Sequence, residues 1–119
     1  MYRRFRFAAV ALSAFVAFGV LSQAASAAPK DAPAKKLEKD AMDNDFITAN
    51  FADAEKKLSD AIKTCGASGC TPKVKAMIYI HLGVVQVNAG NASAGESSFA
   101  EALKIDAAIA PEPELMENK

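Results

Sequence analysis

Apolar residues recur at helical spacing in four stretches of this chain, which predicts four helices. The expected helices cover residues 35–48, 51–64, 72–89 and 92–106. The second stretch is the most regular, because its apolar residues form a single stripe: Phe51, Ala54, Leu58, Ala61, Ile62 and Cys65. The four stretches group into two pairs, so the pattern predicts an all-α fold made of two helix hairpins.

The third stretch differs from the others because it is apolar on nearly every side. Its β-branched residues also allow a strand, but three features favour a helix. Thr71 followed by Pro72 is typical of a helix start, the run is long for a strand, and Gly83 suits a close helix crossing. A helix with so little polar surface either lies at the centre of the bundle or leaves an apolar side for a partner.

Part of the pattern occurs twice, at an offset of 41 residues. Asn50 is followed by small and bulky apolar residues at fixed spacing. Asn91 is followed by residues of the same kinds at the same spacing. Each asparagine can also cap the helix that it precedes. Recurrence at one offset indicates stacked hairpins, in which each unit buries its apolar face against the next.

The second hairpin resembles a tetratricopeptide repeat (TPR). The residues that carry the resemblance are Tyr79, Leu82, Gly83, Gly95, Phe99 and Ala102, although Gln86 and Ala107 depart from the tyrosine and proline of that family. The first hairpin matches through Ala54, Leu58 and Ala61 only; Glu38, Ala41 and Met42 stand at the remaining signature positions. The resemblance implies a short right-handed array of two hairpins over residues 35–107.

Members of that family bind peptides or helices along a groove formed by the first helix of each hairpin. Carried over to this chain, the resemblance implies a mainly apolar partner groove at ten positions: Lys36, Lys39, Asp43, Phe46, Ile47, Met77, Ile80, Val84, Val87 and Asn88. The alternative interpretation is that Met77, Ile80 and Val84 belong to the core.

The first 27 residues have the pattern of a secretory signal peptide. Three arginines precede an apolar stretch of about 15 residues, which is shorter than the ~20 residues of a membrane-spanning helix. Ala25-Ser26-Ala27 is an A-x-A cleavage pattern, so cleavage after Ala27 is expected. An uncleaved anchor is the alternative. Residues 28–34 contain two prolines and predict a flexible leader, and residues 108–119 predict a flexible tail.

Removal of the signal peptide changes the charge balance. The whole chain has 14 basic and 14 acidic residues. All three arginines lie before residue 28, which leaves eleven lysines against 14 acidic residues and a formal net charge of −3. A mildly acidic chain without arginine is poorly suited to nucleic acid or to an anionic membrane surface.

Cys65 and Cys70 are the only cysteines, and they flank two glycines. A close, even pair in an exported chain predicts a disulfide. A zinc site is not expected, because it needs further ligands and the single histidine, His81, lies in another segment. A redox-active pair usually has two intervening residues, whereas this pair has four.

The sequence offers no legible catalytic set. His81 is the one side chain with an ordinary pKa near neutrality, and no nucleophile or paired acid stands at a recognisable spacing. We therefore expect a non-enzymatic chain without metal or cofactor. The resemblance, with the signal pattern and the apolar stretch 72–89, implies a periplasmic or secreted bacterial adaptor that contacts a protein or peptide. The alternative is a small homodimer that self-associates through residues 72–89; a thiol-redox protein is a third reading.

Overall fold

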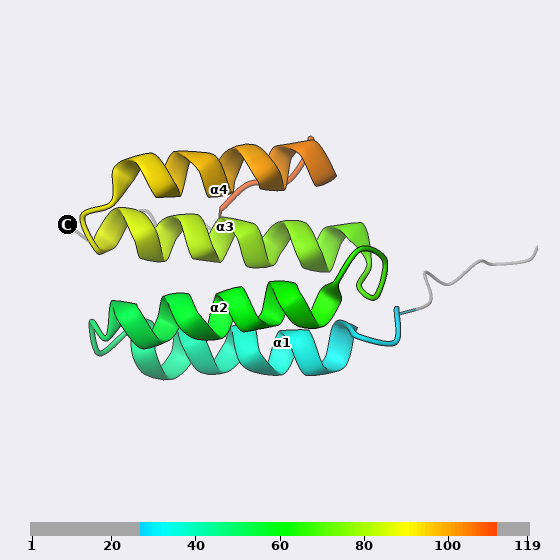
Figure 1. Ribbon diagram of the computed structural model, residues 1–119, viewed down its shortest axis with the longest axis horizontal. Helices are drawn as coiled ribbons and strands as arrows, with labels where there is room; N and C mark the ends of the chain where they lie inside the picture. The colour runs from blue at the N-terminus through cyan, green and yellow to red at the C-terminus, as the bar shows by residue number, and fades with distance from the viewer. Residues whose placement is uncertain (1–26, 112–119) are drawn as a thin grey trace, which may run out of the picture.

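The computed structural model describes residues 27–111, and these residues are all-helical. The expected signal peptide, up to Ser26, and residues 112–119 of the expected tail lie outside the described residues. The helices, labelled as in Figure 1, are α1 (Asp31–Asp40), α2 (Phe51–Cys65), α3 (Pro72–Asn88) and α4 (Ala92–Ile105). A π-helical turn, η1 (Ala41–Phe46), extends α1. No strand occurs between residues 27 and 111, so the all-α prediction is confirmed.

The helix α1 begins at Asp31, four residues before the predicted start. Residues 31–34 are therefore helical and do not belong to an extended leader, and Asp31 and Ala34 are buried. The proline at position 33 is compatible with this start because the first-turn N–H groups of a helix have no partner inside the helix. The acidic side chain of Asp31 also suits the positive end of the helix dipole.

The first hairpin, α1–η1 with α2, is tied by an apolar stripe and by one lysine. Ala54, Leu58 and Ala61 of α2 are fully buried, as their place on the predicted stripe requires. Lys57 Nζ lies 2.6 Å from carboxylate oxygens of both Asp40 and Asp45, which bridges α2 to α1 and η1. Asn50 precedes α2 but does not cap it as predicted, because its side chain donates to Asp53.

The third helix, α3, is the central helix of the bundle. It packs against α2 and α4 and also touches α1 (Figure 1). Ten of its 17 residues are buried, which explains why it has almost no polar face. It begins as predicted: Thr71 Oγ1 accepts a hydrogen bond from the Val74 N–H at 3.4 Å. Most of the apolar residues of α3 are thus buried within the bundle.

The crossing of α3 and α4 depends on two glycines. A Cβ placed on Gly83 would lie 2.5 Å from the ring of Phe99, and one placed on Gly95 would lie 3.0 Å from the carbonyl oxygen of Gly83. Real Cβ atoms do not come as close as 2.5 Å to other atoms. Because the glycines have hydrogen in place of a side chain, the backbones of α3 and α4 can come close together. Asn91 caps α4 as predicted by accepting from the Ala94 N–H at 3.3 Å.

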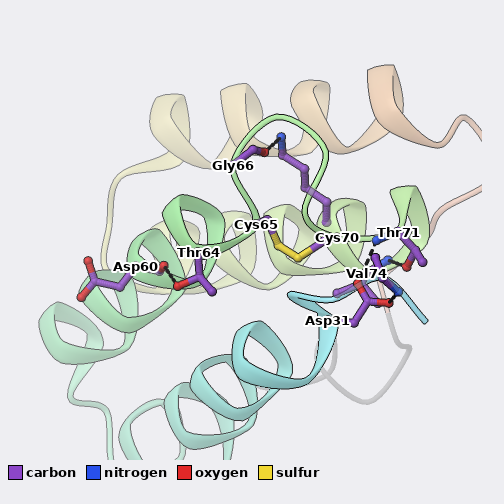
Figure 2. The surroundings of a disulfide bond; sticks show 10 residues. Asp31, Asp60, Thr64, Cys65, Gly66, Cys70, Thr71 and Val74 are labelled. Carbon is purple, nitrogen blue, oxygen red and sulfur yellow. Dashed lines mark hydrogen bonds between the residues drawn. A yellow bond between two sulfur atoms is a disulfide. The ribbon is translucent and has the colours of Figure 1, made fainter.

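The loop between the hairpins is closed by the predicted cysteine pair. The sulfur atoms of Cys65 and Cys70 lie at disulfide distance, 2.03 Å, in the arrangement that Figure 2 shows. Inside the loop, the Gly69 N–H donates to the Cys65 carbonyl at 2.8 Å, and the Gly69 carbonyl accepts from the Lys30 N–H at 2.8 Å. The residues before α1 are thereby attached to the loop that precedes α3.

Candidate functional site

The ten predicted groove positions do not form one groove. Lys36, Lys39 and Asp43 line a recess along α1 and η1. Phe46, Ile80 and Val84 are buried and belong to the core or its edge, which agrees with the alternative interpretation for Ile80 and Val84. Ile47, Val87 and Asn88 are exposed at the helix ends. Met77 alone lines the cavity between the first helices of the two hairpins.

That cavity, called here the α1–α3 groove, has a volume of about 470 Å³ and lies between α1 and the N-terminal half of α3. Asp31, Lys35 and Glu38 line it from α1 at helical spacing, three or four residues apart. Thr71, Lys73, Val74 and Met77 line it from the start of α3. The groove therefore combines an apolar wall on α3 with charged groups from both helices.

One end of the groove is formed by Asp31, which joins α1 to the start of α3. Its Oδ1 accepts from the Thr71 N–H at 2.8 Å, and its Oδ2 accepts from the Ala28 N–H at 3.0 Å. Asp31, Thr71 and Val74 lie together beside the disulfide in Figure 2. Burial opposes ionisation of Asp31 and is the largest single influence, but the hydrogen bonds from Thr71 and Ala28, helped by the charge of Lys35, outweigh it and lower its pKa.

This pKa shift predicts a pH dependence of stability. Because the pKa of Asp31 is depressed in the folded chain, its carboxylate stabilises the fold above the ordinary value of 3.8. The contribution is lost as the pH falls through the lower, folded pKa. We expect Asp31→Asn to lower Tm at pH 7, and the Tm difference from the parent chain to shrink below pH 3.8 in a series of thermal melts.

The control for this prediction is Glu96→Gln, which removes a carboxylate from the exposed face of α4. It should leave Tm at pH 7 nearly unchanged. If the Tm difference between Asp31→Asn and the parent chain stayed constant from pH 7 to pH 2.5, the carboxylate charge would have no part in holding α1 to α3.

Further along the groove, a second polar contact joins the two hairpins. His81 Nδ1 lies 2.8 Å from Glu38 Oε1, and both side chains are nearly buried, 11% and 13% exposed. This contact is a polar link between α1 and α3. His81 is thus held by a residue of the other hairpin.

The two acidic side chains of the groove are thus engaged in the fold, whereas the two lysines are not. Lys35 and Lys73 are exposed, and neither forms an ion pair with any residue between 27 and 111. With one lysine on each helix beside Val74 and Met77, the groove offers positive charge around an apolar wall.

Two structural findings concern other kinds of site. Across the described part of the chain, His, Cys, Asp and Glu side chains nowhere gather in a group of three that could hold a metal ion. The helices of that same part are too short or too polar to cross a bilayer.

Comparisons with protein-family models, with curated proteins and with solved structures found no significant match to this chain.

Proposed function

We propose that this chain is an exported, non-catalytic helical-repeat module of the TPR-like kind, and that it binds a segment of another protein in the α1–α3 groove. The observation that carries the proposal is the composition of that groove. Lys35 and Lys73 carry charges with no ion-pair partner among residues 27–111, next to the apolar Val74 and Met77. A segment that alternates acidic and apolar side chains complements both features.

The packing between helices supports the repeat interpretation. The fully buried Ala54, Leu58 and Ala61 of α2 occupy the places that Gly95, Phe99 and Ala102 take in α4, 41 residues later. Gly83 and Gly95 allow the close crossing that the second hairpin needs. The groove lies between the first helices of the two hairpins and shares Met77 with the positions that the resemblance implies.

Export is part of the proposal and rests on the sequence pattern of residues 1–27. The pairing of Cys65 with Cys70 agrees with an oxidising compartment such as the periplasm or the extracellular space. Self-association through α3 receives less support, because Ile78, Ile80 and Val85 are buried inside the chain's own bundle.

A charge-reversal experiment tests the proposed groove. The probes are two labelled octapeptide pools, in which Asp/Glu or Lys alternates with Leu, Val and Phe. We expect the disulfide-bonded mature chain to bind the acidic pool better than the basic pool, measured by fluorescence anisotropy. The double variant Lys35→Glu, Lys73→Glu should lose roughly tenfold in affinity for the acidic pool, because two partly exposed charge contacts become repulsive.

The matched control is the pair Lys36→Glu, Lys56→Glu, which makes the same change of net charge on exposed lysines outside the groove. Lys36 also belongs to the groove that the family resemblance implies, so this control separates the two surfaces. Equal losses in both double variants would attribute binding to overall charge, and no preference for the acidic pool would exclude the proposed groove.

A further inference from the structure

Among residues 27–111, the buried carboxylate of Asp31 is hydrogen-bonded only to neutral backbone groups. Asp31 is 6% exposed, and its two oxygens accept from the backbone N–H groups of Thr71 and Ala28. Within residues 27–111 it forms no ion pair, and Lys35 acts on it only as a nearby charge. A carboxylate removed from water is costly unless an opposite charge lies beside it.

The expected cleavage site lies at one of these two donors. The A-x-A pattern ends at Ala27, so Ala28 becomes the first residue of the mature chain. Hydrolysis of the Ala27–Ala28 peptide bond consumes one water, leaves a carboxylate on Ala27 and an amine on Ala28. At neutral pH most of this amine takes up a proton, since α-amino groups have an ordinary pKa of about 7.7–8.0.

We propose that cleavage after Ala27 completes the fold, because it turns the Ala28 nitrogen into an ammonium group that forms an ion pair with the buried carboxylate of Asp31. The nitrogen already lies 3.0 Å from Asp31 Oδ2, within ion-pair distance. The Ala28 carbonyl accepts from the Asp31 N–H at 3.0 Å, and the Lys30 N–H is bonded to Gly69, so the backbone holds the new terminus in place.

The charges around this terminus make Asp31 the decisive partner. Lys30 and Lys35 on the α1 side and Lys73 at the start of α3 are positive, and the positive end of the α1 dipole also opposes an ammonium group. Glu38 is engaged with His81. The ion pair therefore depends on Asp31, whose other oxygen is bonded to Thr71 at the start of α3.

The same cleavage alters the α1–α3 groove. Ala27 lines that groove together with Asp31 and Thr71, so cleavage removes one lining residue and leaves an ammonium group beside it. The ion pair rests on the export part of the proposed function, because it needs cleavage after Ala27, and the change in the groove rests in addition on the proposed binding site. A groove that already carries Lys35 and Lys73 gains a third positive group at one end.

Two chains with the same sequence test the ion pair. One is the disulfide-bonded mature chain that begins at Ala28, and the other is that chain acetylated on the Ala28 nitrogen, which keeps the N–H donor and removes the charge. We expect the unmodified chain to melt roughly 4–8 °C higher at pH 6.5. Because the ion pair raises the pKa of the amine, this advantage should be complete below about pH 7.7 and disappear as the pH rises through the folded pKa.

Asp31→Asn supplies the decisive comparison, since it retains an acceptor for Thr71 and removes the carboxylate charge. In the Asp31→Asn background, the acetylated and unmodified chains should have the same Tm at pH 6.5. If the two chains have equal Tm values in the parent background, or if their Tm difference persists in Asp31→Asn, the ion pair is overturned. Intact mass of the exported protein checks the processing step: a mass that begins at Ala28 supports the proposal, and any other N-terminus overturns its processing part without affecting the peptide-binding test.

Discussion

Leu58→Ala is expected to lower the free energy of unfolding by about 2–5 kcal/mol, because it removes a buried side chain and leaves a cavity at the middle of α2. Leu58 is fully buried and belongs to the core that α1, α2 and α3 share. Domains of this kind have a total stability of about 5–15 kcal/mol, so the loss is a large share. Urea denaturation followed by circular dichroism measures it as a lower transition midpoint.

A matched truncation distinguishes the cavity from general loss of apolar surface. Ile47→Ala removes a side chain of similar size that is 73% exposed in the turn before α2. Its effect should stay within about 0.5 kcal/mol. If Leu58→Ala were no more harmful than Ile47→Ala, the stripe Ala54, Leu58 and Ala61 would not be the centre of the first hairpin.

Gly83→Val is the second substitution with a large expected effect, about 1–3 kcal/mol of destabilisation from overpacking. The added Cβ would meet the Phe99 ring, whose three nearest atoms lie at 2.5, 2.7 and 2.9 Å from its position. The intrinsic helix propensity of valine exceeds that of glycine, so an open site would respond with a small gain in stability. A lower urea midpoint in Gly83→Val therefore reports the close crossing of α3 and α4.

A double-mutant cycle tests whether the destabilisation comes from the contact between position 83 and the Phe99 ring. Gly83→Ala should be destabilising in the parent chain, but less so when Phe99→Leu removes the ring that the new methyl group meets. Ser97→Ala, on the exposed face of α4, serves as the control for helix propensity alone. Additive effects of Gly83→Ala and Phe99→Leu would mean that the ring and the glycine are not in contact.

Much of this fold could be predicted because the deciding residues act locally. The stripe from Phe51 to Cys65 has helical period, Thr71 with Pro72 starts a helix, and the cysteine spacing closes a short loop. The strand alternative for residues 72–89 is excluded, and the reason for their apolar character is now clear. The helix α3 packs against α1, α2 and α4. Sequence periodicity alone could not show whether its apolar residues face other helices of the chain or a partner.

The start of α1 differs from the prediction because prolines usually mark a break in a helix. Pro29 and Pro33 predict an extended leader, but the position of Pro33 in the first helical turn costs no hydrogen bond within the helix. The signal that could have revealed the helix is Asp31, an acidic residue well placed for a first turn. Its contact with Thr71, 40 residues away, is a tertiary feature that no local pattern contains.

The position of the groove could not be read from the repeat pattern either. The positions that the resemblance implies lie on one face of each first helix, but the cavity depends on how far apart α1 and α3 lie. That separation is set by the whole bundle, including the Glu38–His81 contact and the link from Asp31 to Thr71. Only Met77 belongs both to the predicted set and to the α1–α3 groove.

The most direct test of the proposed binding surface is a ¹H–¹⁵N chemical-shift titration of the mature chain with the acidic octapeptide pool. We expect the amide signals of residues 31–38 and 71–77 to shift together and saturably, while those of α4 stay in place. Shifts centred on α4 or on the Ile47 turn, or no saturable shift at all, would contradict it.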